Sequence, residues 1–225
     1  MATIPASVLE FLSELKENNT REWFAEHKPT YQQQEAYLKD FYKVIETGLN
    51  EEDVIEKVKI FRIYKDVRFS KDKTPYNSHR SVSFSRAGAH LRGGYYLRIE
   101  PGNTIVAGGF FAPQPADLLR IRKEFEMDDS DIREILNQKD FKKAFGGFDT
   151  SYQVKTAPKG FSKEHAAIDL IRNKSFVVKR EFTDKEVLAP DFAKVVVQHF
   201  RLLRPYFDYM SDVLTTDLNG VSLLE

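Results

Sequence analysis

The residues most suited to chemistry lie in one stretch, residues 61–80, which combines cationic, aromatic and hydroxyl-bearing side chains. Within it, residues 61–69 alternate between apolar and polar side chains, and this alternation predicts a strand. Its polar face would present two arginines, a tyrosine and an aspartate, and the loop at residues 70–78 adds lysines, hydroxyls and a second tyrosine. Guanidinium groups match phosphate or carboxylate oxygens, ammonium groups add charge, and aromatic rings can stack a base. The segment therefore predicts a site for a small anion, with nucleotides among the candidates.

Nine side chains are the candidates for binding that anion. Arg98 is included because it shares the polar face of a predicted strand, residues 94–100, with Tyr96. Asp66 and Asp72 would orient the cations, bind a ribose hydroxyl, or share a metal ion with the ligand. The expected ligand-binding residues are Arg62, Tyr64, Asp66, Arg68, Lys71, Asp72, Lys73, Tyr76 and Arg98.

No familiar catalytic motif accompanies these residues. The chain lacks GxxxxGK[ST], GxGxxG, HExxH and GxSxG, so catalytic residues cannot be named and whether the protein is an enzyme stays open. An enzyme would need an acid, base or nucleophile, and the nearby candidates are Asp66, Asp72, Tyr76, His79 and a desolvated lysine. The acidic run at residues 128–131 is explained by the start of a helix. We therefore expect neither a metal site nor a cofactor.

The charge of the chain is unevenly distributed. Lys and Arg number 34, as do Asp and Glu, so the formal net charge is zero. Residues 57–98 nevertheless carry a net charge of +9, and residues 1–56 carry −7. This distribution allows a local basic pocket, but it also allows an internal layer of salt bridges between the acidic helices and the arginines. Asp66 with Arg68 is the simplest such pair, and both interpretations stay open at this point.

The periodicity of the apolar residues changes along the chain. Helical spacing predicts helices within residues 5–50, and alternation predicts a sheet over residues 57–111. Residues 114–220 are predicted to be mainly helical, with one further strand at residues 174–182. Strands grouped between helical runs favour an α+β fold, a mainly antiparallel sheet of about five strands covered by N- and C-terminal helices. With no recognisable linker, we expect a single domain over residues 1–225.

A few residues mark where elements begin, break or approach one another. Thr20 follows Asn19 and is suited to cap a helix. The paired glycines at residues 108–109 lie in a predicted strand and suggest a bulge or a close backbone approach. Pro205 should split the long C-terminal helix.

Composition excludes several classes of protein. Hydrophobic residues make up 41 % and aromatic residues 13 %, which excludes an intrinsically disordered chain. No apolar stretch is long enough to span a bilayer, the N-terminus lacks the pattern of a signal peptide, and the absence of cysteine excludes disulfides and thiolate zinc sites. We therefore expect a soluble cytoplasmic protein that does not associate with membranes.

The chain also resembles a known family. The string F-R-x-Y-x-D-x-R-F-S-x-D-K-x-P-Y at residues 61–76 is similar to the hallmark of the domain of unknown function 2461 family. Further matching segments are the string NNTREWF at residues 18–24, the GGYY strand at residues 93–96, the glycine pair at residues 108–109 and the string PKGF at residues 158–161. The resemblance implies one intracellular domain whose activity is not established, so it assigns a role to no residue.

Three functions follow from these observations. The first is binding of a small phosphate- or carboxylate-bearing ligand, with or without catalysis. The second is a non-catalytic protein-interaction or scaffold domain, in which the basic segment is neutralised internally. The third is nucleic-acid binding through the basic segment, against which the zero net charge and the acidic flanks argue. The oligomeric state is left open by the sequence.

Overall fold

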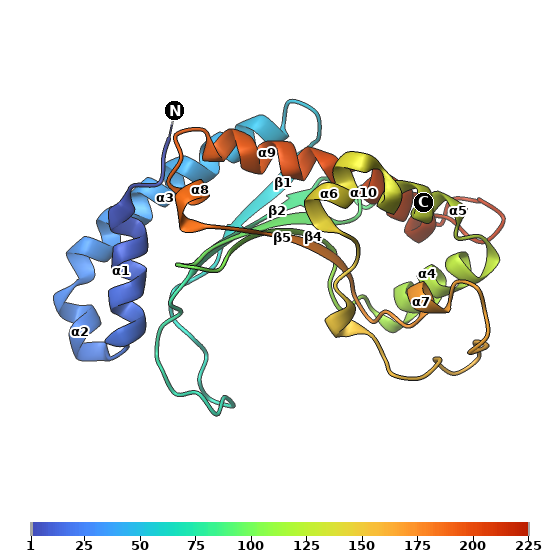
Figure 1. Cartoon of the computed structure of the whole chain (residues 1–225), viewed down its shortest axis with the longest axis horizontal. Helices are drawn as coiled ribbons and strands as arrows, with labels where there is room; N and C mark the ends of the chain where they lie inside the picture. Colours follow the sequence, from blue (N-terminus) through green and yellow to red (C-terminus); the bar gives the residue numbers. More distant parts are fainter. Residues whose placement is uncertain (1, 225) are drawn as a thin grey trace. The chain divides into compact units, whose positions relative to one another are not determined.

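The computed structural model describes residues 2–224 and confirms the α+β fold (Figure 1). Five strands form one antiparallel sheet in the order β1-β2-β3-β4-β5. Among the helices of the described residues, none is both long enough and apolar enough to cross a membrane. The strands are β1 (Ile55–Ile60), β2 (Arg80–Arg86), β3 (Gly94–Ile99), β4 (Thr104–Phe110) and β5 (Phe176–Phe182).

The contacts within the chain divide it into two compact units. The expectation of one domain over the whole chain stays a prediction. The first unit comprises Met1–Phe84, Tyr96–Val106 and Glu181–Gln198, and the second comprises Ser85–Tyr95, Ala107–Arg180 and His199–Glu225.

Three N-terminal helices in the first unit confirm the helical pattern predicted there. The first and third present an apolar stripe to the core because their apolar residues recur every three or four positions, whereas the short second helix buries Phe24. Helix α2 begins after Thr20, whose side chain accepts a hydrogen bond of 3.2 Å from the backbone N–H of Trp23, so the predicted cap is confirmed. Helix α1 packs along α3 (Figure 1). The helices are α1 (Ala6–Glu17), α2 (Arg21–Glu26) and α3 (Lys28–Leu49), and the short helix α8 (Asp184–Val187) belongs to the same unit.

The predicted strand at residues 61–69 is wrong. The regular strand β1 lies earlier and ends at Ile60, and residues 61–79 form a long loop that leaves the sheet (Figure 1). The neighbour of β1 in the sheet is β2, which begins at Arg80, so residues beyond Phe61 have no strand to pair with. The backbone N–H of Phe61 donates to the carbonyl oxygen of Ser81 at 2.9 Å, and this hydrogen bond closes the ladder.

The alternation of apolar and polar residues at positions 61–69 therefore does not correspond to a strand. Ile63 is buried and Val67 is half-buried, whereas Phe69 is 96 % exposed. An isolated bridge between Tyr64 and Tyr76 is the pairing that joins the two arms of the loop. The predicted sheet region, residues 57–111, is otherwise close to the observed strands β1 to β4.

Residues 114–220 are mainly helical, as predicted. The predicted strand at residues 174–182 is confirmed as β5. The long C-terminal helix is split as expected, because α9 ends at Leu202 and α10 begins at Arg204, with Pro205 in its first turn. The remaining elements are α4 (Pro115–Met127), α5 (Ser130–Asn137), α6 (Lys139–Phe145), the 3-10 helix η1 (Thr150–Tyr152), α7 (Ile168–Ile171), α9 (Phe192–Leu202) and α10 (Arg204–Thr215).

Gly109 is the site of the close backbone approach that the paired glycines suggest. Its φ of +132° is a conformation that other residues rarely adopt, and a Cβ there would overlap the carbonyl oxygen of Phe176 in β5. The glycine therefore allows the backbones of β4 and β5 to approach at this position.

Candidate functional site

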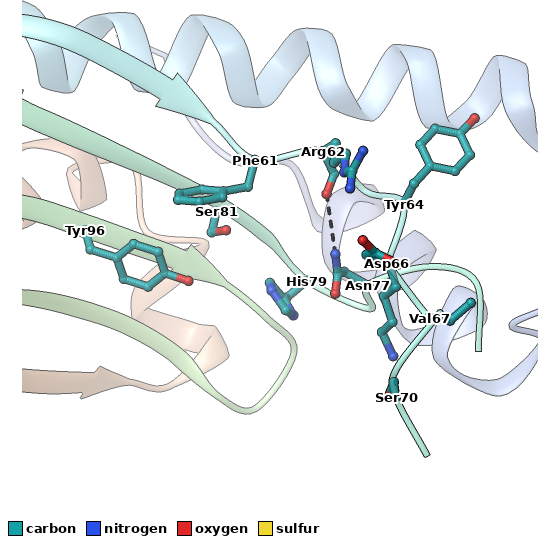
Figure 2. Close-up of a pocket in the computed structure, with 11 residues that line it drawn as sticks. Phe61, Arg62, Tyr64, Asp66, Val67, Ser70, Asn77, His79, Ser81 and Tyr96 are labelled. Atoms are coloured by element: carbon teal, nitrogen blue, oxygen red, sulfur yellow. Dashed lines mark hydrogen bonds between the residues drawn. The ribbon is translucent and has the colours of Figure 1, made fainter. Parts of the chain in front are cut away.

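A pocket of about 390 Å³ lies in the first unit, where β1 ends and the loop at residues 61–79 begins (Figure 2). Its lining comes from both arms of that loop, from the start of β2 and from β3. Figure 2 shows the Tyr96 hydroxyl and the His79 ring pointing toward the same part of the pocket. The lining residues are Phe61, Arg62, Tyr64, Lys65, Asp66, Val67, Ser70, Asn77, His79, Ser81 and Tyr96.

Arg62 provides a cation to this pocket that is not already paired. Its side chain is exposed, and within residues 2–224 its guanidinium forms no ion pair or hydrogen bond. The hydrogen bond of the residue is made by its backbone, whose carbonyl oxygen accepts from the Asn77 amide at 3.4 Å. A guanidinium in this state is available to an anion that enters the pocket.

The other charged groups around the pocket neutralise one another. Arg68 donates from Nε and Nη2 to the two carboxylate oxygens of Asp66, at 2.9 and 2.6 Å. This forked pair holds the pKa of the Asp66 carboxyl below its usual range. Lys65 donates to Asp72 at 2.8 Å and to the Thr74 hydroxyl at 2.7 Å, and the Lys65 ammonium holds the pKa of Asp72 well below its usual range. Asp66 lines the pocket, but its charge is already compensated there.

Aromatic rings form part of the pocket wall. Phe61 and Tyr96 meet edge to face, with their ring centroids 6.1 Å apart. Tyr64 also lines the pocket, but its ring points away from those two rings (Figure 2). The Phe61 and Tyr96 rings therefore offer an apolar surface beside the polar groups.

His79 is a half-buried side chain in the pocket wall. Burial lowers the pKa of its imidazole, so the neutral form is favoured. The charge of Glu100 opposes this effect, while the charges of Arg98, Arg80 and Lys65 add to it. At neutral pH the imidazole of His79 is therefore uncharged, and it can form hydrogen bonds but is not a fixed cation.

The structure brings together some of the predicted site residues and separates others. Arg62, Tyr64 and Asp66 line the pocket, whereas Arg68 and Asp72 lie outside its lining and form the ion pairs described above. The remaining predicted residues also lie outside the pocket, and they are Lys71, Lys73, Tyr76 and Arg98.

Each of these four has a different setting. Lys71 is exposed, and the Lys73 ammonium donates to the carbonyl oxygen of Val67 at 2.9 Å. Tyr76 is buried. Arg98 pairs with Glu100 across 3.2 Å. The loop at residues 61–79 therefore directs most of its cations away from the pocket.

The side chain of Tyr76 is packed inside the protein and is not exposed to a ligand. Its ring stacks on Phe24 of α2, with centroids 4.0 Å apart, and the Asn19 side chain bonds to its backbone twice. Tyr76 in turn forms the bridge to Tyr64, which lines the pocket. Through these contacts the N-terminal helices position one wall of the site.

The alternative of an internal salt-bridge layer describes part of the basic segment. Arg80 donates to both carboxylate oxygens of Glu35 in α3, at 2.7 Å each, and the side chains are 5 % and 12 % exposed. Arg68 pairs instead with Asp66 on its own segment, as the simplest form of that alternative predicts. Arg62 belongs to neither pair, which distinguishes it from the other arginines of the segment.

Several pocket residues were not among the predicted ligand contacts. Phe61 belongs to the stretch that was predicted to be a strand, and Ser81 lies within the predicted sheet region, residues 57–111. His79 was considered as an acid or base, and Tyr96 as a neighbour of Arg98. The signal that could have found them is the polar stretch at residues 77–81, which approaches Phe61 once β1 pairs with β2.

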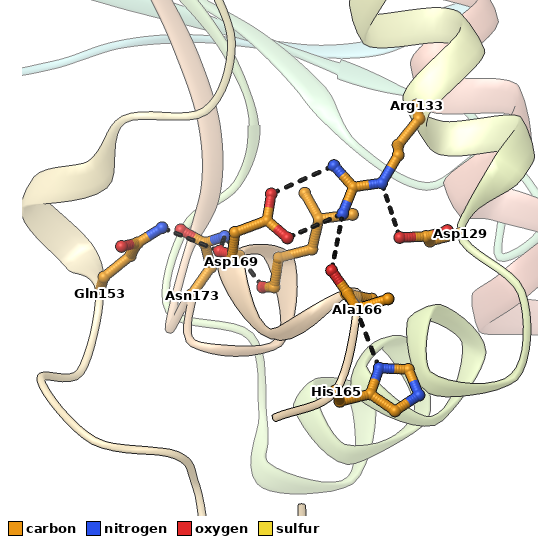
Figure 3. A network of polar contacts seen from close by, with 9 residues as sticks. Asp129, Arg133, Gln153, His165, Ala166, Asp169 and Asn173 are labelled. Atoms are coloured by element: carbon orange, nitrogen blue, oxygen red, sulfur yellow. Dashed lines mark hydrogen bonds and ion pairs between the residues drawn. The ribbon is translucent and has the colours of Figure 1, made fainter. Parts of the chain in front are cut away.

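A second cluster of polar groups lies in the second unit, with Arg133 at its centre (Figure 3). Arg133 of α5 donates to Asp129 at 2.6 Å and to both carboxylate oxygens of Asp169, at 2.7 and 3.2 Å. The Gln153 amide donates to the backbone oxygen of Asp169 at 2.9 Å. These contacts fasten the segment around α7 to α5, while the buried Oδ1 atom of Asn173 in the same cluster has no hydrogen-bond partner among the described residues.

The side chains of the described part of the chain do not assemble a metal site. Within residues 2–224, no group of three or more His, Asp or Glu residues is arranged to hold a metal ion.

One family model matches most of the chain. The model described as "Conserved hypothetical protein (DUF2461)" matches residues 7–209. The chain belongs to this family. The DUF2461 match includes the whole pocket lining, although its description names no activity. The comparisons with curated proteins and with solved structures gave no significant match.

Proposed function

We propose that the protein binds a small anionic molecule, bearing a phosphate or carboxylate group, in the pocket at residues 61–81 and 96. One observation carries this proposal: Arg62 lines a pocket of about 390 Å³, and its guanidinium has no partner among the described residues. An unpaired guanidinium beside a pocket of ligand size matches the geometry with which arginine holds carboxylate and phosphate oxygens.

The surroundings of Arg62 support the same interpretation. The negative charge of Asp66 is neutralised by Arg68, so it opposes an incoming anion less than a free carboxylate would. Phe61 and Tyr96 offer apolar surface to the rest of the ligand, so a planar ring is favoured over a bare ion. A nucleotide or another aromatic anion therefore fits the pocket better than a long polyanion.

The proposal is tested by thermal unfolding and calorimetry with a panel of anions. Nucleoside monophosphates, phenyl phosphate and benzoate are compared with inorganic sulfate at equal ionic strength. We expect at least one aromatic anion to raise the melting temperature more than sulfate does, since a ligand that binds only the folded state stabilises it. If no organic anion stabilises the protein beyond sulfate, the proposal is wrong.

Matched variants of two cations on the same loop locate the binding. Arg62→Gln should weaken binding by about tenfold or more, because a charged hydrogen bond contributes about 1.5–3 kcal/mol. Lys71→Gln is the control, since Lys71 is exposed and lies outside the pocket lining. Equal loss in the two variants would point to general electrostatic attraction instead of the pocket.

A protein-interaction role is the second candidate, and the exposure of Phe69 favours it. Phe69 lies on the loop between β1 and β2 with 96 % of its surface exposed, beside the exposed Arg68. A partner with an apolar surface would cover the Phe69 ring. Affinity purification with wild type and Phe69→Ser tests this role, which requires a partner that only the wild type retains.

We also propose a cytoplasmic location, supported by the absence of cysteine from the sequence. Cell fractionation tests this location directly, and recovery of the protein outside the cytoplasm would overturn it.

A further inference from the structure

Four polar side chains that line the pocket have no hydrogen-bond partner for their side-chain atoms within residues 2–224. They are the guanidinium of Arg62, the imidazole of His79 and the hydroxyls of Ser81 and Tyr96. A guanidinium alone offers five N–H donors, and the imidazole and hydroxyls add three more groups. A carboxylate has two oxygens and is satisfied by one guanidinium fork, whereas a phosphate monoester has three terminal oxygens and a second negative charge.

We propose that the ligand is a dianionic phosphate monoester and that His79 takes up a proton from solvent when this ligand binds. The inference rests on the proposed function and names both the class of the ligand and the origin of the second positive charge. Arg62 matches one negative charge, and the protonated imidazole of His79 matches the other.

The charged groups around His79 explain why it needs the ligand in order to hold a proton. Glu100 is the carboxylate that favours a charged imidazole, but it is paired with Arg98. The other nearby cations are Lys65, which is bound to Asp72, and Arg80, which is bound to Glu35. In the empty pocket, burial and these cations favour neutral imidazole, and burial lowers its pKa. A dianion in the same pocket reverses this balance, because an opposite charge within about 4–6 Å stabilises the imidazolium.

Phenyl phosphate and phenyl sulfate form the matched pair of probes. Both place a tetrahedral anion on the same ring, but at pH 7.5 phenyl phosphate is mostly a dianion, since the second pKa of a phosphate ester is about 6. Phenyl sulfate carries a single charge throughout. We expect wild-type protein to bind phenyl phosphate about tenfold more tightly, the factor that corresponds to one unit of pKa.

Proton uptake is measured by calorimetry at pH 7.5 in buffers of different ionisation enthalpy. The expected result is uptake of up to about one proton per bound ligand. Phenyl sulfate does not itself titrate, so any pH dependence of its affinity comes from the protein. Its affinity should rise by up to about tenfold when the pH is lowered from 7.5 to 6.5, because protonated His79 favours binding.

Two histidine variants assign the proton. His79→Gln keeps a hydrogen-bonding side chain but cannot become charged, and it should remove the proton uptake and reduce the preference for phenyl phosphate. His90→Gln is the control, because His90 is exposed and outside the pocket lining, and it should behave like wild type. If His79→Gln does not fold, the imidazole of His79 can be titrated by NMR in wild-type protein with and without phenyl sulfate.

The outcomes separate this inference from the proposed function. Binding without proton uptake and without preference for phenyl phosphate overturns the inference and leaves anion binding in place. Proton uptake that persists in His79→Gln assigns the proton to another group and also overturns it. If neither probe nor any other organic anion binds, the proposed function and the inference both fail.

Discussion

The side chain of Asn19 connects the N-terminal helices to the loop that forms the pocket. Its amide nitrogen donates to the carbonyl oxygen of Tyr76 at 3.0 Å, and its amide oxygen accepts from the N–H of Tyr76 at 3.1 Å. Tyr76 is buried against Phe24 and bridges to Tyr64 of the pocket lining. Asn19→Ala removes both hydrogen bonds without adding bulk, so it tests how firmly this wall of the pocket is held.

The expected loss follows from the two bonds. A hydrogen bond contributes about 0.5–1.5 kcal/mol to stability, so removal of two should lower the free energy of unfolding by about 1–3 kcal/mol. Both bonds are only partly buried, and water can replace them in part, which places the expected loss near 1–2 kcal/mol. The adjacent Asn18 is the control, because its side chain is bonded to the carbonyl oxygen of Glu14 at an exposed helix end. Asn18→Ala should cost no more than about 0.5 kcal/mol.

Urea denaturation measures the free energies, and hydrogen exchange at the Tyr76 amide shows whether the effect is local. Asn19→Ala should accelerate exchange at Tyr76 and weaken binding of phenyl phosphate, since Tyr64 loses the support of its neighbour. A loss equal to that of Asn18→Ala, or unchanged exchange at Tyr76, would refute the role given to Asn19.

Three further predictions concern the core, the buried ion pair and pH. Gly109→Ala should lower the free energy of unfolding by more than about 3 kcal/mol in urea denaturation, from backbone strain and overlap with the β5 carbonyl, whereas Gly146→Ala, with positive φ but open space, should cost about 1 kcal/mol. Equal losses in the two glycine variants would contradict the close approach of β4 and β5. Glu35→Ala should cost about 3–5 kcal/mol because it leaves the buried guanidinium of Arg80 without its partner, and the double change Glu35→Leu with Arg80→Met should recover most of that loss in the same assay. A double variant no more stable than the single one would count against this origin of the loss. For His79, burial lowers the folded-state pKa, so the unfolded chain binds more protons between that pKa and about 6.5 and stability falls as pH falls through this window. His79→Gln should show a shallower fall in urea titrations from pH 7.5 to 5.5, and identical slopes would exclude this contribution.

The helices and most of the strands could be predicted from the sequence because their signals are local. In β3, the alternation of Tyr95, Leu97 and Ile99 with polar residues places these three side chains in the core. The cap at Thr20 and the break at Pro205 depend on residues within one or two turns of the helix they affect. These features need no knowledge of which distant segments meet.

The end of β1 and the identity of the available cation required the tertiary structure. Residues 61–69 alternate like a strand, but strand pairing needs a neighbour, and β2 begins only at Arg80. The sequence could likewise place the arginines in one basic segment without showing that Arg68 is paired with Asp66 and Arg80 with Glu35. Ion pairing depends on distances of a few ångströms between groups that can be far apart in the chain. The sequence therefore determined the sign of the local charge but not which charged groups are paired. The tertiary contacts decided that Arg62, which lines the pocket, has no ion-pair partner among the described residues.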